Sequence, residues 1–175
     1  GEVTRFQGAL QVTIKRVRLW HEGEYDPSDY LPVSEKNIDE MYAKLLTFID
    51  SIENEYLKEL LNGFFRKDES FASMFRQSSA AKTVHHGFVG GLLEHTLGVT
   101  KLCEYYSKTY PILNRYLLLT AAICHDIGKT REISRFPEND YTDEGQLLGH
   151  IVMGSEMVVE KSRDIQGFPL IFHSY

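Results

Sequence analysis

The chain has 175 residues, of which 42% are hydrophobic and 25% are charged. This is the composition of a globular protein, and it excludes intrinsically disordered, collagen-like and coiled-coil classes. The formal net charge of −6 excludes a broadly basic nucleic-acid binder, although a metal ion or a local basic patch could still hold a phosphate group.

Cysteine content and hydropathy indicate the setting of the protein. Cys103 and Cys124 are too few for a disulfide framework, which favours a reducing, cytoplasmic compartment. We expect neither a signal peptide nor a membrane partner, because no apolar run approaches the roughly 18 residues that span a bilayer.

The first 36 residues predict a short β segment and a linker. Residues 5–19 alternate like a strand, and one strand or hairpin cannot form a domain alone. We therefore interpret residues 1–20 as the remnant of a larger β unit. Residues 21–36 hold two prolines, a glycine and five acidic residues, and predict a linker. The positions expected on one face of the strand are Phe6, Gly8, Leu10, Val12 and Ile14.

The remainder, residues 37–175, has helical spacing and predicts an all-α domain. Asn37, with Glu40 three positions later, has the form of a capping box at the start of the first helix. Asp68 is expected to cap a third helix. The residues expected to carry the apolar faces of these helices are Ile38, Met41, Leu45, Phe48, Ile49, Ile52, Leu57, Leu60, Leu61, Phe64, Phe65, Phe71, Met74 and Phe75.

Three more helices are expected over residues 89–108, 111–127 and 142–163, with a loop over 128–142. The middle helix is apolar nearly all round, which predicts a central buried element. The expected inward stripes of the other two are Phe88, Leu92, His95, Val99, Leu102 and Tyr106, and Leu147, Ile151, Gly154 and Val158.

These three helices bring histidines to their predicted inward faces. His95 lies in an apolar stripe, where a histidine alone is more often a hydrogen-bonded core residue than a ligand. His125 and Asp126 end the central helix, and His150 borders the last stripe. A buried carboxylate and imidazole need compensation, which a divalent cation or a simple His–Asp hydrogen bond would provide. Ligands from several helices are typical of metal sites in bundles.

This series of residues resembles the HD superfamily of metal-dependent phosphohydrolases. The segments HHGFVGGLLEHTLGV (85–99), AAICHDIGK (121–129) and GQLLGHIVMG (145–154) are similar to YhaM-type 3′-to-5′ exoribonucleases, in which an OB-fold precedes the HD domain. The resemblance covers nearly the whole chain. It implies a mainly helical HD-domain bundle with an OB-like β remnant, and the trimming of single-stranded RNA or DNA from the 3′ end.

By position, the resemblance makes His95, His125 and Asp126 metal ligands, with Asp126 between two ions, and His150 the next ligand. One or two divalent ions are implied, Mn²⁺ by family likeness, with Fe, Ni, Zn or Mg as alternatives. Such an ion lowers the pKa of bound water and supplies hydroxide. Asp126 and Lys129 are the candidate catalytic residues, and Lys129 is placed to touch a phosphate oxygen. A solvated cation near a helix end is the alternative for Lys129.

Two residues that precede His95 in the chain have weaker assignments. His86 is a candidate substrate-binding residue, and the alternative is a role in the glycine-rich turn alone. Glu94 is a candidate for orienting a metal ligand or a water. The alternative is that it is an acid that faces solvent.

The ends of the chain depart from the family pattern. A further helix with a His pair and a later Asp ligand do not occur before Tyr175, and Gly1 stands where a start Met is usual. We therefore expect a domain truncated at both ends. The rival functions are a nucleotide phosphohydrolase acting on a small molecule and a nucleic-acid-binding regulatory module with a vestigial metal site. The expected partner is a single-stranded nucleic acid or nucleotide, and a homo-oligomer is compatible with the sequence.

Overall fold

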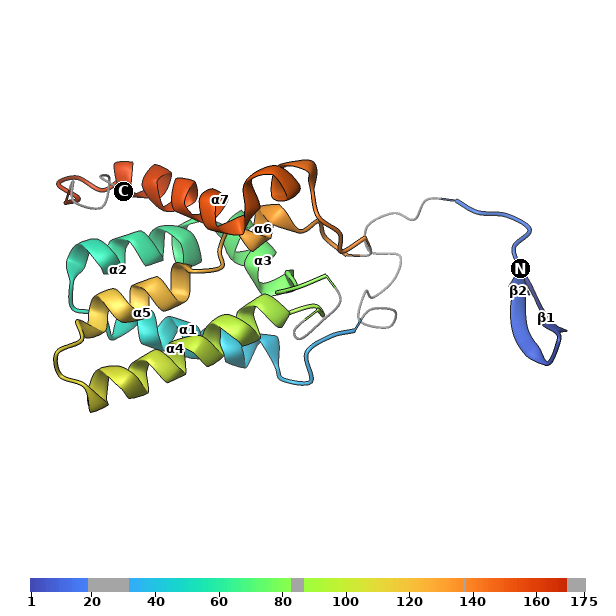
Figure 1. Cartoon of the computed structure of the whole chain (residues 1–175), viewed down its shortest axis with the longest axis horizontal. Helices are drawn as coiled ribbons and strands as arrows, with labels where there is room; N and C mark the ends of the chain where they lie inside the picture. The colour runs from blue at the N-terminus through green and yellow to red at the C-terminus, as the bar shows by residue number, and fades with distance from the viewer. Residues whose placement is uncertain (19–31, 83–86, 137, 170–175) are drawn as a thin grey trace. The chain divides into compact units, whose positions relative to one another are not determined.

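The computed structural model describes residues 1–18, 32–82, 87–136 and 138–169 (Figure 1). The chain divides into two units, residues 1–30 and 31–175. The first contains two short strands, and the second is helical. The predicted fold class, mainly α with a short N-terminal β segment, is confirmed.

The described part of the first unit is an antiparallel hairpin of β1 (Glu2–Phe6) and β2 (Ala9–Thr13). Gln7 and Gly8 form its turn with φ of 50° and 86°, the left-handed values that a two-residue hairpin turn requires. Every residue of both strands is exposed.

The turn corrects the prediction of a single apolar face. Phe6 pairs with Ala9, whereas Leu10 pairs with Arg5. Directly paired residues share a face and neighbours alternate, so Phe6 lies on the face opposite to Leu10. Alternation counted straight through the chain had missed the reversal at the turn.

The described end of the predicted linker, residues 32–36, falls within the helical unit. Val33 forms a parallel bridge with Val89, and the Val89 N–H donates to the Pro32 carbonyl at 2.8 Å. Residues 21–31 of that predicted linker include no described residue.

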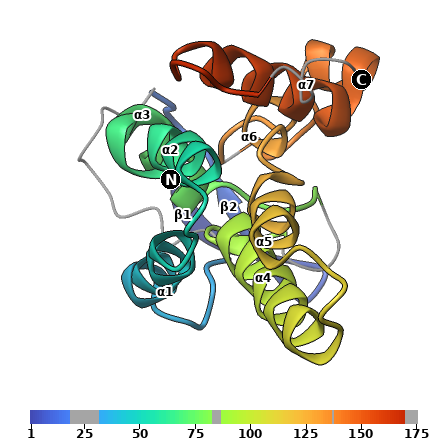
Figure 2. The same cartoon turned by 90° about the vertical axis from the view of Figure 1, so that its left-hand side faces the viewer.

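The described part of the helical unit contains eight helical segments, and none of these helices is long and apolar enough to cross a membrane. In chain order they are α1 (Ile38–Asp50), α2 (Glu55–Asn62), the π-helical turn η2 (Gly63–Lys67), α3 (Glu69–Gln77), α4 (Gly91–Thr109), α5 (Arg115–Cys124), α6 (Lys129–Glu132) and α7 (Asp143–Arg163). Figure 2 shows α4 and α5 side by side, and α6 next to α7.

Helix starts follow from capping side chains. The predicted caps at Asn37 and Asp68 are confirmed, and Thr142 caps α7 where the last helix was expected to begin. Each of these side chains accepts the backbone N–H three residues on. Asn54 and Asn114 do the same for α2 and α5. These bonds satisfy N–H groups that lack an acceptor within the helix.

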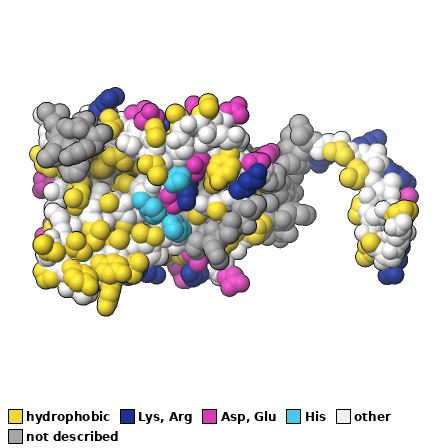
Figure 3. Space-filling model, in the orientation of Figure 1, with side chains coloured by type: hydrophobic (Ala, Val, Ile, Leu, Met, Phe, Trp, Pro, Cys, Tyr) yellow, Lys and Arg dark blue, Asp and Glu magenta, His cyan; other side chains and the backbone are white. Residues whose placement is uncertain are grey.

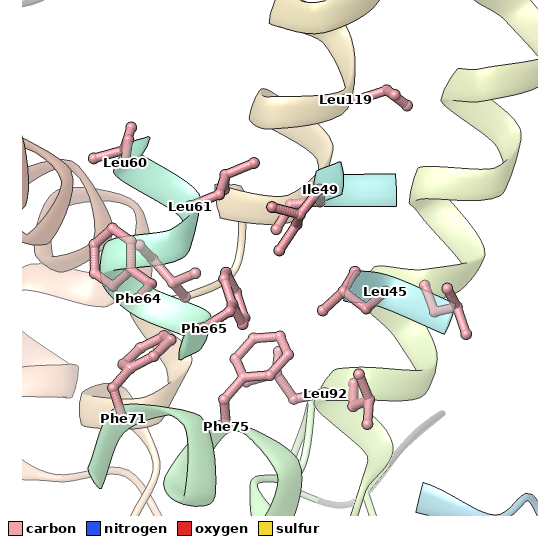
Figure 4. Close-up of a cluster of buried hydrophobic side chains, with 14 of the residues drawn as sticks. Leu45, Ile49, Leu60, Leu61, Phe64, Phe65, Phe71, Phe75, Leu92 and Leu119 are labelled. Atoms are coloured by element: carbon pink, nitrogen blue, oxygen red, sulfur yellow. The ribbon is translucent and has the colours of Figure 1, made fainter. Parts of the chain in front are cut away.

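The core lies between α1, α2, η2, α3, α4 and α5 (Figure 4), and Met157 of α7 also belongs to it. Phe65 contacts both Phe71 and Phe75 edge-to-face, with ring centroids 5.5 and 5.0 Å apart. The predicted core positions of α1–α3 are largely confirmed, while Ile38, Phe48 and Met74 are only partly buried. The fully buried large side chains are Leu45, Ile49, Ile52, Leu61, Phe64, Phe65, Phe75, Leu92, Leu93, Leu119, Ile123 and Ile127.

The predicted stripe of α4 is wrong beyond its first turn. Leu102 is 54% and Tyr106 43% exposed, whereas Thr96 and Thr100 are fully buried. The Thr100 hydroxyl donates to the Thr96 carbonyl at 2.8 Å, so a polar side chain can occupy the buried face. His95 therefore borders the buried face rather than lying in it.

The predicted stripe of α7 fails for another reason. Leu147 is 85% and Ile151 74% exposed, while Gly154 is buried as expected. Gly149 has φ 72° and ψ 158°, which interrupts the helix. The prediction requires one continuous helical phase over residues 142–163. Residues on either side of the break do not share one.

Two further expectations around α5 are corrected. The helix begins at Arg115, after the Asn114 cap, and its Leu117 is 43% exposed, so the element is not buried all round. The segment predicted as a loop, residues 128–142, contains the short helix α6.

Candidate metal centre

Three helices of the second unit position the candidate ligands. His95 lies in the second turn of α4, and His125 is the residue that ends α5, directly before Asp126. His150 follows the break at Gly149 in α7. Figure 3 shows histidine side chains gathered in one place on the helical unit, beside acidic and basic groups.

His95, His125 and Asp126 form a compact group of three potential ligands. The two Nε2 atoms lie 3.2 Å apart, and Asp126 Oδ2 is 3.4 Å from His95 Nε2 and 3.3 Å from His125 Nε2. Ligand atoms about 2.1 Å from one shared ion, in tetrahedral or octahedral arrangement, lie roughly 3.0–3.4 Å from one another. The three observed separations fit that range.

The ring orientation of His125 also suits a metal ligand. Its Nδ1 lies 2.8 Å from the Ala122 carbonyl, which can only accept, so Nδ1 carries the proton. The Nε2 atom then points at His95 and Asp126. The hydrogen bond to Asp126 raises the pKa of His125, against the effect of burial. The lone pairs of the two Nε2 atoms and of Asp126 Oδ2 converge on one point and would repel one another without a proton or a cation between them. These residues therefore fit a metal ion.

Asp126 is the buried charge of the centre, with 5% of its side chain exposed. Burial opposes its ionisation, but hydrogen bonds from His125 and Lys129 outweigh burial and hold the pKa of this carboxyl well below its usual range. Lys129 Nζ lies 2.8 Å from Oδ2, and its side chain is 16% exposed. The carboxylate is thus ionised and available as a ligand.

His150 faces the other oxygen of the same carboxylate, with Nε2 3.4 Å from Asp126 Oδ1. On its far side, Nδ1 lies 3.0 Å from the Glu132 carboxylate. Sequence reasoning misses Glu132, because it predicts a loop over residues 128–142. Its four-residue helix is too short to show periodicity, and its partner lies 18 residues further on.

The remaining predicted site residues have different surroundings. Glu94 accepts hydrogen bonds from the Ser34 hydroxyl and the Lys36 ammonium, each at 2.6 Å, so it ties the segment before α1 to the start of α4. Its role toward a ligand of the metal stays a prediction. His86 lies outside the described residues. Cys124 packs against the core, and burial raises the pKa of its thiol to about 12, as expected of a core thiol.

Comparison with known proteins identifies the family. The family model for the HD domain matches residues 92–172, which include all four candidate ligands. The chain contains an HD domain. HD domains bind divalent metal ions, and His95, His125 and Asp126 form a cluster that could hold one.

This HD protein is also similar to a curated protein over most of its length. The 3′-5′ exoribonuclease YhaM of Geobacillus sp. (strain WCH70) is 34% identical over 152 residues, which are 86% of this chain and 46% of that protein. The chain spans about half the length of this relative. No solved structure matches the chain.

Proposed function

We propose that this HD protein hydrolyses phosphodiester bonds with a divalent metal ion, and that it shortens single-stranded RNA or DNA from the 3′ end. The observation that carries the proposal is the convergence of His95, His125 and Asp126 within ligand distance of one another. The similarity to YhaM, which is named a 3′-5′ exoribonuclease, supports the choice of a polymeric substrate.

Three residues would hold the first ion, namely His95, His125 and Asp126. His150 faces the second oxygen of Asp126, so the carboxylate is placed to serve two ions. When bound, the ion supplies a Lewis acid and a hydroxide at neutral pH. We expect Mn²⁺ by likeness to the family. This chemistry reconciles a net charge of −6 with a polyanionic substrate, since the positive charge at the site is the metal's.

Lys129 is the candidate phosphate contact. Its ammonium is held 2.8 Å from Asp126 Oδ2, which places a fixed positive charge beside the ligand group. A positive charge at this position would favour the approach of a phosphate oxygen and would stabilise added negative charge in the transition state. Lys129→Met should therefore lower kcat while leaving metal binding in place.

The parts of the chain have matching roles in this proposal. Residues 37–175 form the catalytic HD domain, residues 21–36 the linker, and residues 1–20 the remnant of an OB-like module for nucleic acid. We expect the protein to work in the cytoplasm.

The proposal is tested with 5′-labelled RNA, 5′-labelled single-stranded DNA and the small ester bis(p-nitrophenyl) phosphate, each incubated with Mn²⁺. A ladder of stepwise shortened products is expected from a polymer. Asp126→Asn should abolish it, and Asp39→Asn, which changes an acid that is 88% exposed on α1, should not. Cleavage of the small ester alone would favour the nucleotide phosphohydrolase. Binding of RNA without any cleavage would favour the regulatory module.

A further inference from the structure

Glu132 is a buried acid at the contact between α6 and α7, with 10% of its side chain exposed. A buried carboxylate is costly unless hydrogen bonds or an ion pair compensate it. In the part of the chain that the structure describes, the hydrogen bonds to this carboxylate come from His150. The backbone N–H of His150 donates to Oε1 at 3.0 Å, and Nδ1 lies 3.0 Å from both oxygens.

The backbone of Glu132 is fixed by the start of α7. The N–H of Thr142 donates to the Glu132 carbonyl at 2.9 Å. A Cβ atom at Gly145 would lie 2.4 Å from the same carbonyl oxygen, so only glycine permits this close approach. The position from which the carboxylate reaches His150 is therefore held from both sides.

The break in α7 explains why His150 needs an external acceptor. Gly149, with φ 72°, separates His150 from the preceding helical turn. Backbone N–H groups at the beginning of a helical segment lack an acceptor within the helix. Glu132 supplies that acceptor and, with the same carboxylate, a partner for the imidazole ring.

We infer that Glu132 is the positioning residue of His150. By accepting the Nδ1–H, it leaves Nε2 directed at Asp126 Oδ1 and available to a metal ion. A carboxylate on the second ring nitrogen of a ligating histidine fixes the ring and increases its basicity. This inference rests on the metal centre of the proposed function, and Glu132 acts on that centre only through His150.

Mn²⁺ titration calorimetry of the metal-free protein tests the inference without any substrate. Glu132→Ala should weaken binding about 10–100-fold, the usual effect of losing such a partner. Glu132→Gln should lose less Mn²⁺ affinity than Glu132→Ala, because its amide oxygen can still accept the Nδ1–H of His150. Glu104→Ala is the matched control: this acid is 16% exposed and pairs with Arg115 and Lys108 instead, so Mn²⁺ affinity should stay unchanged.

A second measurement separates positioning from general stability. In ¹⁵N-histidine-labelled protein, His150 Nδ1–H should give a slowly exchanging signal in the wild type and in Glu132→Gln, and lose it in Glu132→Ala. The Nδ1–H of His125, bonded to the Ala122 carbonyl, is the internal control and should persist in all three. This signal requires neither bound metal nor catalysis, so it remains decisive even if the protein cleaves no phosphodiester.

Two results would overturn the inference. One is wild-type Mn²⁺ affinity in folded Glu132→Ala. The other is an unchanged His150 Nδ1–H signal in that variant. If Glu132→Ala does not fold, the Glu132→Gln variant decides, and a fast-exchanging His150 Nδ1–H in that variant counts against the inference.

Discussion

At the scale of single residues, Asp126 connects every group of the candidate centre. Its Oδ2 lies within 3.4 Å of His95, His125 and Lys129, and its Oδ1 lies 3.4 Å from His150. His125 and Lys129 hold the pKa of Asp126 low although the side chain is buried. One ionised carboxylate therefore organises three imidazoles and a lysine before any ion is added.

His125 should make the stability of the metal-free protein depend on pH. Its pKa is raised in the fold by the hydrogen bond to Asp126, so the fold favours the protonated ring. This stabilisation is fully present below about pH 6.5, the ordinary histidine value, and is lost as the pH rises through the raised value. In EDTA-treated protein, the advantage of the wild type over His125→Gln in the free energy of unfolding should shrink between pH 6 and pH 9. An advantage that is constant or grows over this range would contradict the assignment.

At the scale of elements, α6 and α7 approach so closely that glycine is required between them. A Cβ atom on Gly128 would lie 2.0 Å from the His150 carbonyl oxygen and 2.7 Å from the Gly154 nitrogen. Both obstacles are backbone atoms, which cannot turn away as a side chain can. The contact fixes the distance between the segment after Asp126 and the one that carries His150.

Gly128→Ala should therefore disrupt both packing and the metal centre. We expect a loss of about 2–4 kcal/mol in the free energy of unfolding, because the helices must separate. Mn²⁺ affinity should fall with it. Gly98→Ala is the matched control, since nothing lies within 4 Å of its Cβ position on α4. It should stabilise the protein by about 0.5–1 kcal/mol in the same urea titration. A neutral Gly128→Ala would disprove the close contact.

Asp68 connects two other elements, as the cap of α3 and the partner of Lys161 on α7 at 3.0 Å. The hydrogen bond from the Phe71 N–H is the main cause that lowers the pKa of Asp68, with Lys161 adding to it against desolvation. Stability from this group is present above about pH 4 and is lost as the pH falls through the lowered value.

Asp68→Ala should cost about 1 kcal/mol at pH 7, and the cost should be smaller at pH 3. Asp68→Asn keeps a capping oxygen and removes only the charge, so its cost at pH 7 should be lower. Urea titrations at the two pH values compare the variants. Equal costs for Asp68→Ala at pH 7 and pH 3 would exclude a contribution from the ionised carboxylate.

What the sequence could predict differs between short motifs and distant contacts. The helix starts at Asn37, Asp68 and Thr142 were predictable because a cap and its N–H lie three residues apart. The proximity of His125 and Asp126 follows from adjacency. Glu132 could not be predicted, since its place depends on a backbone break at Gly149 and on a close contact with α7.

The exposed stripes show a second limit. Leu102 and Leu147 have the residue type and spacing of buried positions, yet both are exposed. Periodicity identifies an apolar face but does not state what covers it. The buried face of α4 includes Thr96 and Thr100, so it does not coincide with the face that the apolar residues predict.

At the scale of the whole molecule, the helical unit has one contiguous core that reaches from α1 to α7. The ligands come from α4, the end of α5 and α7, so an ion bound by them joins elements that are far apart in sequence. A ligand that binds only the folded state stabilises it by mass action.

Mn²⁺ should consequently raise the thermal midpoint of the protein. At 100 times the dissociation constant, the gain is about 2.7 kcal/mol in the free energy of unfolding. EDTA should reverse the shift, and Asp126→Asn should show none. An equal shift in Asp126→Asn would place the ion elsewhere on the molecule.

The measurement that tests the central claim most directly is the Mn²⁺ content of purified protein after dialysis against the metal. Elemental analysis should find one to two ions per chain in the wild type. His125→Ala and Asp126→Asn should retain little, and Asp39→Asn should match the wild type. A wild-type protein that holds no divalent metal at saturating Mn²⁺, or an Asp126→Asn variant that holds as much, would contradict a metal centre built on these residues.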